Sequence, residues 1–219
     1  MARRTGQREE PRHWLPSQGI DPAPLAELNA EGLGLLAMRA ADAAEEAGSL
    51  LVLPPLLAEL RRSWTDLSAQ AVRRLSAAPF SLFDAGFASS PRWLELRGPG
   101  VHDQHRVTPA FFEPATARAL TRRMLVYGWH LARSRPRAAC LVFGAPLAAI
   151  ESLAACSLSA LEAAADRNGE ALRPRWAHQP AIWKALLVAA SAGADQRLHE
   201  LLLGGVQRLA AETLAAHPL

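Results

Sequence analysis

Residues 114–134 read PATARALTRRMLVYGWHLARS, and this stretch decides the fold that we expect. Pro114 suits the first turn of a helix. Large side chains then recur at helical spacing on one side of the stretch, at Leu120, Met124, Tyr127 and Leu131. Other segments repeat this periodicity, and no segment shows the alternation that is typical of a strand. The sequence therefore predicts an all-α protein.

Further helices are predicted on both sides of this one from apolar spacing and from Ser, Asp, Pro and Gly at helix ends. The expected ranges are 25–47, 55–62, 66 or 68 to 75, 137–143, 146–155, 157 or 159 to 168, 179–192 and 194–217. We expect Gly32 and Gly34 to break the first of these into two pieces, because glycine weakens a helix.

The chain has 219 residues, enough for one sizeable core and short for a second domain. We expect residues 1–24 to be a mobile N-terminal arm, able to dock through Trp14 and Leu15, and residues 25–219 to be a single compact multi-helix domain. Loop-forming residues at 98–109 suggest a subdivision or hinge there.

Two segments are similar to one another. LVLPPLLAEL at 51–60 and LVFGAPLAAI at 141–150 share four of ten residues. This leaves open that the domain has two related helical halves, or that the match is a coincidence in a chain rich in Ala and Leu.

Charge and hydrophobicity exclude some function classes. The 24 basic residues exceed the 21 acidic ones by only three, and Lys184 is the single lysine. Arginine pairs are spread over separate predicted helices among acidic residues, so we expect no nucleic-acid binding. The stretch 138–150 is about half as long as a membrane helix, and the start of the chain is poor signal-peptide material. We expect a cytoplasmic protein without a membrane-inserted segment.

No motif predicts catalysis, a cofactor or a metal site. His102, Asp103 and His105 could ligate a metal, but their spacing matches no known site and a solvated loop is the simpler interpretation. Cys140 and Cys156 are expected to be inert buried thiols. Leu203-Gly204-Gly205-Val206 lacks the strand and the Lys of a phosphate loop, and we interpret it as close helix packing.

The best candidate binding surface lies on the predicted helix at 114–134. Four residues project within about 60° of one another at ~100° per residue, and they are Arg118, Arg122, Trp129 and Arg133. Arg and Trp are enriched at interface hot spots. The alternative is that neighbouring helices bury the tryptophan and pair the arginines internally.

A second candidate contact surface is the aromatic segment 80–96. Phe83, Phe87 and Trp93 are its candidate contact residues. The spacing leaves open whether these side chains belong to an interface or to the core.

The stretch from Met124 to Trp183 resembles the C-terminal half of the SctK (YscK/PscK) family of type III secretion accessory proteins. The resemblance involves Leu125-Val126-Tyr127-Gly128, Cys140-Leu141, Leu147, Ile150, Leu158, Leu161, Leu172 and Trp176. It implies an all-helical, non-enzymatic cytoplasmic adaptor of the sorting platform at the base of the injectisome. Its partners would be the cytoplasmic domain of the inner-membrane ring protein and the pod protein that recruits the ATPase complex.

A weaker likeness to the flagellar regulator FlhD covers Leu125 to Trp176, with a similar turn at Asn168-Gly169. It implies a DNA-binding transcriptional regulator that acts with a partner. The small number of basic residues on any one helix face makes this the alternative hypothesis. An enzyme whose site is built from residues distant in sequence is the third.

Overall fold

The computed structural model describes residues 20–45, 53–87 and 110–215. Its first helices and strand are α1 (Ala23–Glu45), α2 (Pro55–Thr65), α3 (Ala69–Ser76) and β1 (Phe83–Asp84). The helices after residue 110 are α5 (Pro114–Ser134), α6 (Pro136–Phe143), α7 (Leu147–Ala154) and α8 (Leu158–Asn168). The 3₁₀ helix η2 (Gly169–Ala171), strand β2 (Arg173–Pro174), α9 (Pro180–Ala192) and α10 (Asp195–Ala215) complete the fold.

Local capping sets several of these boundaries. The Ser68 and Ser157 hydroxyls each accept a hydrogen bond from the backbone N–H three residues later, at 3.2 Å, and so cap α3 and α8. Gly144 and Gly193 stop α6 and α9 in the left-handed region, with φ of 54° and 68°. These residues explain why the helix positions predicted from sequence are confirmed.

The predicted break in the first helix is wrong. Helix α1 runs without interruption from Ala23 to Glu45. Gly32 is buried there, and a Cβ at this position would clash with the ring of Phe83. Gly32 therefore serves close packing and not a chain break. The helix also begins at Ala23, two residues before the expected start of the domain at 25, while residues 1–19 of the arm lie outside the described residues.

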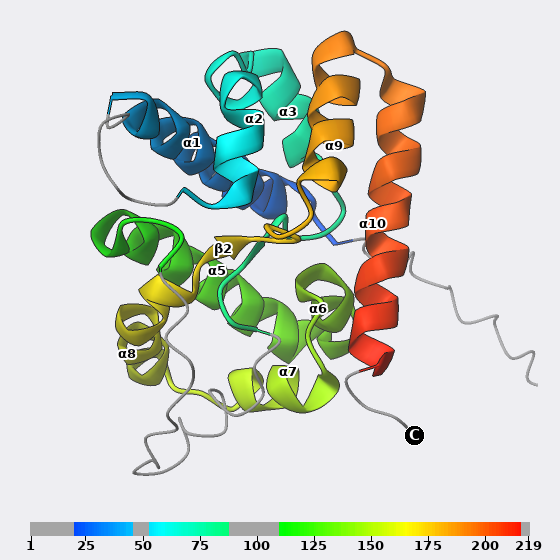
Figure 1. The fold of residues 1–219 in the computed structure, drawn as a ribbon. Helices are drawn as coiled ribbons and strands as arrows, with labels where there is room; N and C mark the ends of the chain where they lie inside the picture. Colours follow the sequence, from blue (N-terminus) through cyan, green and yellow to red (C-terminus); the bar gives the residue numbers. More distant parts are fainter. Residues whose placement is uncertain (1–19, 46–52, 88–109, 216–219) are drawn as a thin grey trace, which may run out of the picture.

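The helices form two groups joined by a short antiparallel ladder (Figure 1). Helices α1, α2, α3 and α9 pack together, α5 packs on α6, α7 and α8, and α1 also contacts α5. The ladder pairs Phe83 with Pro174 and Asp84 with Arg173. Helix α10 runs along one side and touches α9 and then α6.

One hydrophobic core extends through both groups, which confirms an all-α compact domain. The rings of Trp64 on α2 and Trp183 on α9 lie 5.3 Å apart inside it. The expected subdivision at 98–109 falls outside the described residues, and the segments on its two sides share this core.

Buried Asn29 on α1 organises the segment that leads into β1. Its Nδ2 donates to the carbonyl oxygens of Ser76 (3.3 Å) and Phe80 (3.0 Å). Its Oδ1 accepts from the N–H of Leu82 at 2.8 Å. One side chain thus satisfies three backbone groups that no helix or sheet pairs, as buried polar groups require.

The two similar segments at 51–60 and 141–150 agree in structure only over their second halves. Residues 57–60 and 147–150 are helical in both, whereas Leu53 is outside a helix and its counterpart Phe143 ends α6. The duplication stays a prediction.

No single helix among the described residues combines the length and hydropathy needed to cross a membrane. Only α6 and α7 taken together pass that test of length and composition, and they are bent by 117° from one another.

Candidate functional site

The groove between the start of α1 and the outer face of α5 is the candidate binding site. It has a volume of about 520 Å³, and Leu28, Arg122, Val126, Tyr127 and Trp129 are among its lining residues. A second hollow of about 380 Å³ continues from it toward the end of α5. Because both hollows share Pro24, Tyr127 and His130, we treat them as one surface and call it the α1–α5 groove.

Hydrogen bonds between residues close in sequence fix the starts of the two helices that form the groove. The Asp21 carboxylate accepts a hydrogen bond from the N–H of Ala23 at 3.0 Å, which fixes the entry into α1. The Glu113 carboxylate accepts from the N–H and hydroxyl of Thr116 at the start of α5, at 3.0 and 2.8 Å, and these bonds lower the pKa of Glu113. On α5 the predicted apolar residues Leu120, Met124 and Leu131 are buried, whereas Tyr127 of the same face is partly buried and lies in the groove wall.

The structure places the four arginine and tryptophan candidates on this outer face, but three of them already have contacts within the chain. Arg118 pairs with Asp166 of α8 at 3.5 Å. The half-buried Trp129 donates its indole N–H to the carbonyl oxygen of Cys156 at 3.0 Å, and the guanidinium of Arg133 lies 4.7 Å from its ring centre. These contacts make Trp129 a rigid part of the groove wall.

Arg122 differs from its neighbours. It is exposed at the groove, and no ion pair involves it within residues 20–45, 53–87 and 110–215. The next residue, Arg123, pairs instead with Glu31 of α1. One turn along, Val126 is 40% exposed. A partner protein can bind such a surface, because the arginine and the exposed apolar side chain beside it are both available for contact.

The Tyr127 hydroxyl lies in the wall of the same groove. Its oxygen is enclosed, and it makes no hydrogen bond to any described residue. Burial, and then the nearby charge of Asp21, raise the pKa of Tyr127, so the hydroxyl stays a neutral donor at physiological pH. The hydroxyl is therefore a polar group of the groove wall that is closed to solvent.

In the described part of the aromatic segment, residues 80–87, the two candidate contact residues belong to the core and not to an interface. Phe83 and Phe87 are each 1% exposed and belong to the core. The ring of Phe87 stacks on that of Phe143 with centres 4.3 Å apart. Packing against α1, α6 and α9 buries these side chains, and the third candidate, Trp93, lies outside the described residues.

Sequence reasoning missed Arg175, the most deeply buried charge among the described side chains. Its Nε donates to the carbonyl oxygen of Ser81 at 2.7 Å, and a terminal nitrogen donates to that of Phe143. Burial lowers the pKa of its guanidinium. Nothing in the sequence separates Arg175 from the other arginines, because its partners are backbone atoms distant in sequence. Its role is to tie the ladder to α6.

Other titratable groups do not assemble into a metal or nucleophile site in the part of the chain that the structure describes. No three His, Cys, Asp or Glu side chains there lie close enough to hold an ion. His102, Asp103 and His105 fall outside that part. The side chains of Cys140 and Cys156 are half-buried, not fully buried as expected, and burial raises the pKa of Cys140.

No match was found. Comparison of the chain with protein-family models, with curated proteins and with solved structures gave no significant similarity. The function is therefore argued from the α1–α5 groove and from the sequence pattern.

Proposed function

We propose that this protein is a non-enzymatic adaptor that binds a helical segment of another protein in the α1–α5 groove. The observation that supports this most is Arg122, which has no ion pair with any described residue, beside the exposed Val126 on a helix whose position is fixed by a buried face. Helix-in-groove recognition uses apolar anchors at helical spacing, with charges at the rim for orientation.

The chemistry of the groove defines the segment that would fit it. Apolar side chains would cover Val126, and a carboxylate would pair with Arg122. The partner segment is therefore an amphipathic helix with at least one acidic residue.

The resemblance of residues 124–183 to the SctK family suggests where this adaptor acts. We place it in a bacterial type III secretion sorting platform, cytoplasmic and held at the inner membrane through its partners. The partners would be the cytoplasmic domain of the ring protein and the pod protein. The part of α5 from Met124 onward lies in the resembling stretch and supplies nearly half of the residues that line the groove, whereas Arg122 lies just before it.

The DNA-binding alternative has less support from the described side chains. Arg74, Arg118, Arg123 and Arg197 each pair with a carboxylate of the same chain. A nucleic-acid surface would need such cations aligned and free for phosphates.

The test is size-exclusion chromatography with light scattering of the protein mixed with the ring-protein domain or the pod protein from the same organism. Arg122→Glu and Val126→Asp should each raise the Kd of the complex at least about 10-fold, because charge reversal and a buried carboxylate act at its centre.

Arg61→Glu is the matched control, since it reverses an exposed arginine on α2 away from the groove. Trp129→Ala is a poor test, because it would also remove an internal hydrogen bond and expose core. A complex that is insensitive to Arg122→Glu would overturn the groove as the contact site. Absence of a complex with both proteins, together with salt-sensitive retention of duplex DNA, would favour the regulator hypothesis.

A further inference from the structure

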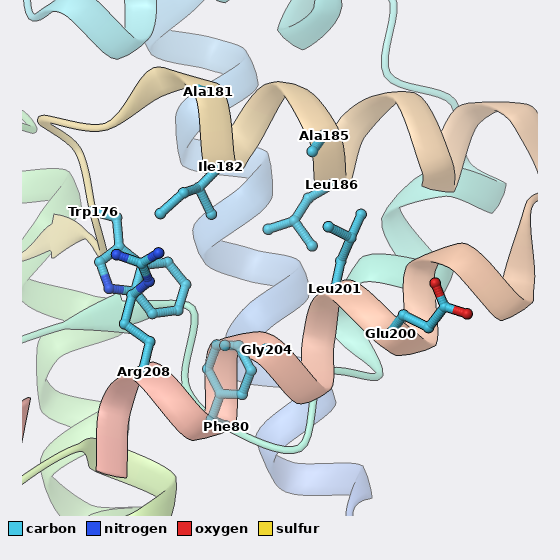
Figure 2. A pocket seen from close by; sticks show the side chains of 11 residues that line it. Phe80, Trp176, Ala181, Ile182, Ala185, Leu186, Glu200, Leu201, Gly204 and Arg208 are labelled. Atoms are coloured by element: carbon cyan, nitrogen blue, oxygen red, sulfur yellow. The ribbon is translucent and has the colours of Figure 1, made fainter. Parts of the chain in front are cut away.

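A second groove lies between α9 and α10, on a different surface from the α1–α5 groove (Figure 2). Its volume is about 370 Å³. Ile182 and Ala185 of α9 form one side, and Leu201 and Gly204 of α10 form the other. We call it the α9–α10 groove.

The two charged residues that line this groove stand on opposite sides of Gly204. Glu200 precedes Gly204 by four residues on α10 and Arg208 follows it by four. At 1.5 Å per residue each lies about 6 Å from Gly204 along the helix axis. Figure 2 shows Glu200 at one end of the groove and Arg208 at the other, over the ring of Trp176.

This order of charges is complementary to itself. When two copies of α10 run antiparallel about a two-fold axis at Gly204, each residue faces the one equally far on the other side of the axis. Glu200 of one copy then faces Arg208 of the other, and the second pair forms by symmetry. Isologous contacts of this kind are the commonest basis of homodimers.

Gly204 supports the same geometry, because packing within the described part of the chain does not require a glycine at this position. A Cβ at Gly204 would meet no atom within 4 Å, whereas at Gly205 it would lie 2.6 Å from the ring of Phe80. A glycine inside a helix costs roughly 0.5–1 kcal/mol relative to alanine. A glycine at a helix crossing lets the two backbones approach closely.

Apolar side chains form both walls of the groove. Ile182 and Ala185 of α9 and Leu201 of α10 are partly exposed there. A facing copy would remove them from water, which supplies the main favourable term of association.

We propose that this protein forms a two-fold symmetric dimer through the α9–α10 groove, with Glu200 of each subunit paired to the partner subunit's Arg208. In the single chain Glu200 bonds to Gln196 and Arg197, and Arg208 bonds to Gln179. These exposed contacts are weak and can be exchanged on association. The second copy leaves the α1–α5 groove free, so the dimer would present two adaptor sites.

Sedimentation equilibrium and light scattering of the full chain test this proposal. The wild type should reach about twice the 23.6 kDa mass of one chain as its concentration rises. Glu200→Arg and Arg208→Glu should each raise the dimer Kd at least about 10-fold, because each places like charges opposite one another. The double variant Glu200→Arg/Arg208→Glu should restore a Kd within about 3-fold of the wild type.

This rescue separates an interface effect from a folding defect, since both single changes are retained in the double variant. Gly204→Leu should abolish the dimer with unchanged helicity, and Arg61→Glu on α2 is the neutral control. A wild type that stays monomeric up to about 200 µM, equivalent to a Kd above the range of specific dimers, would overturn the proposal. A dimer that is unaffected by both single reversals would also overturn it.

Discussion

Replacing Asn29 by alanine removes three buried hydrogen bonds at once. The amide of Asn29 satisfies the carbonyls of Ser76 and Phe80 and the N–H of Leu82, at 3.3, 3.0 and 2.8 Å. Each such bond contributes about 1 kcal/mol net, so their loss costs about 3 kcal/mol. Alanine is the better helix former, which offsets about 0.5 kcal/mol in α1.

We therefore expect Asn29→Ala to lower the free energy of unfolding by about 2.5 kcal/mol. For a domain of this size the melting temperature should fall by about 5–10 °C. Urea unfolding followed by circular dichroism gives the free energy, and calorimetry gives the melting temperature. The slope of the urea transition should stay unchanged, because the same surface is exposed on unfolding.

Gln70→Ala is the matched control, since it removes an exposed side-chain amide from α3. Its effect should stay within about 0.5 kcal/mol. A loss of less than about 1 kcal/mol for Asn29→Ala would refute the reasoning, because three unsatisfied backbone groups in the core cannot cost so little.

Three further predictions concern packing, titration and the buried charge. Gly205→Ala should lower the free energy of unfolding by about 1–3 kcal/mol, because the added methyl group overpacks the core. Gly204→Ala, measured on dilute protein, should raise it by about 0.5–1 kcal/mol. Urea midpoints that shift in the same direction for both variants would contradict this. In a Cys156→Ser background, the alkylation rate of Cys140 should rise with pH, and the midpoint of this rise should be higher in the folded protein than in the protein unfolded in urea. The reason is that burial raises the pKa of Cys140 and disfavours the thiolate. Equal midpoints would count against this. Arg175→Lys should lower the free energy of unfolding by about 2 kcal/mol, because an ammonium group cannot reproduce the planar guanidinium that donates to two carbonyl oxygens. An unchanged urea midpoint would show that these hydrogen bonds are not needed for stability.

The raised pKa of Cys140 also makes the stability of the fold depend on pH, with a defined sign. The folded chain favours the neutral thiol, so its contribution is fully present below the pKa of the unfolded thiol. It is lost as the pH rises through that value toward the folded pKa. Unfolding measured between neutral and alkaline pH should show this loss in the wild type and not in Cys140→Ser.

The sequence determined the features that depend on neighbours along the chain. Ser68 and Ser157 cap helices through N–H groups three residues away, and Gly144 and Gly193 end helices by their own conformational freedom. The apolar faces of α5 and α10 follow from helical periodicity. The all-α class and most helix positions were predictable for this reason.

Only the tertiary structure decided which side chains remain at the surface. Phe83 and Phe87 are buried, and Trp129 is half-buried, by helices far away in sequence, which no local pattern specifies. The same holds for Arg118, which pairs with Asp166, and for Arg122, which forms no ion pair with the described residues. Periodicity places a residue on a face of its own helix, but packing between distant segments decides whether that face meets the core, an internal partner or water.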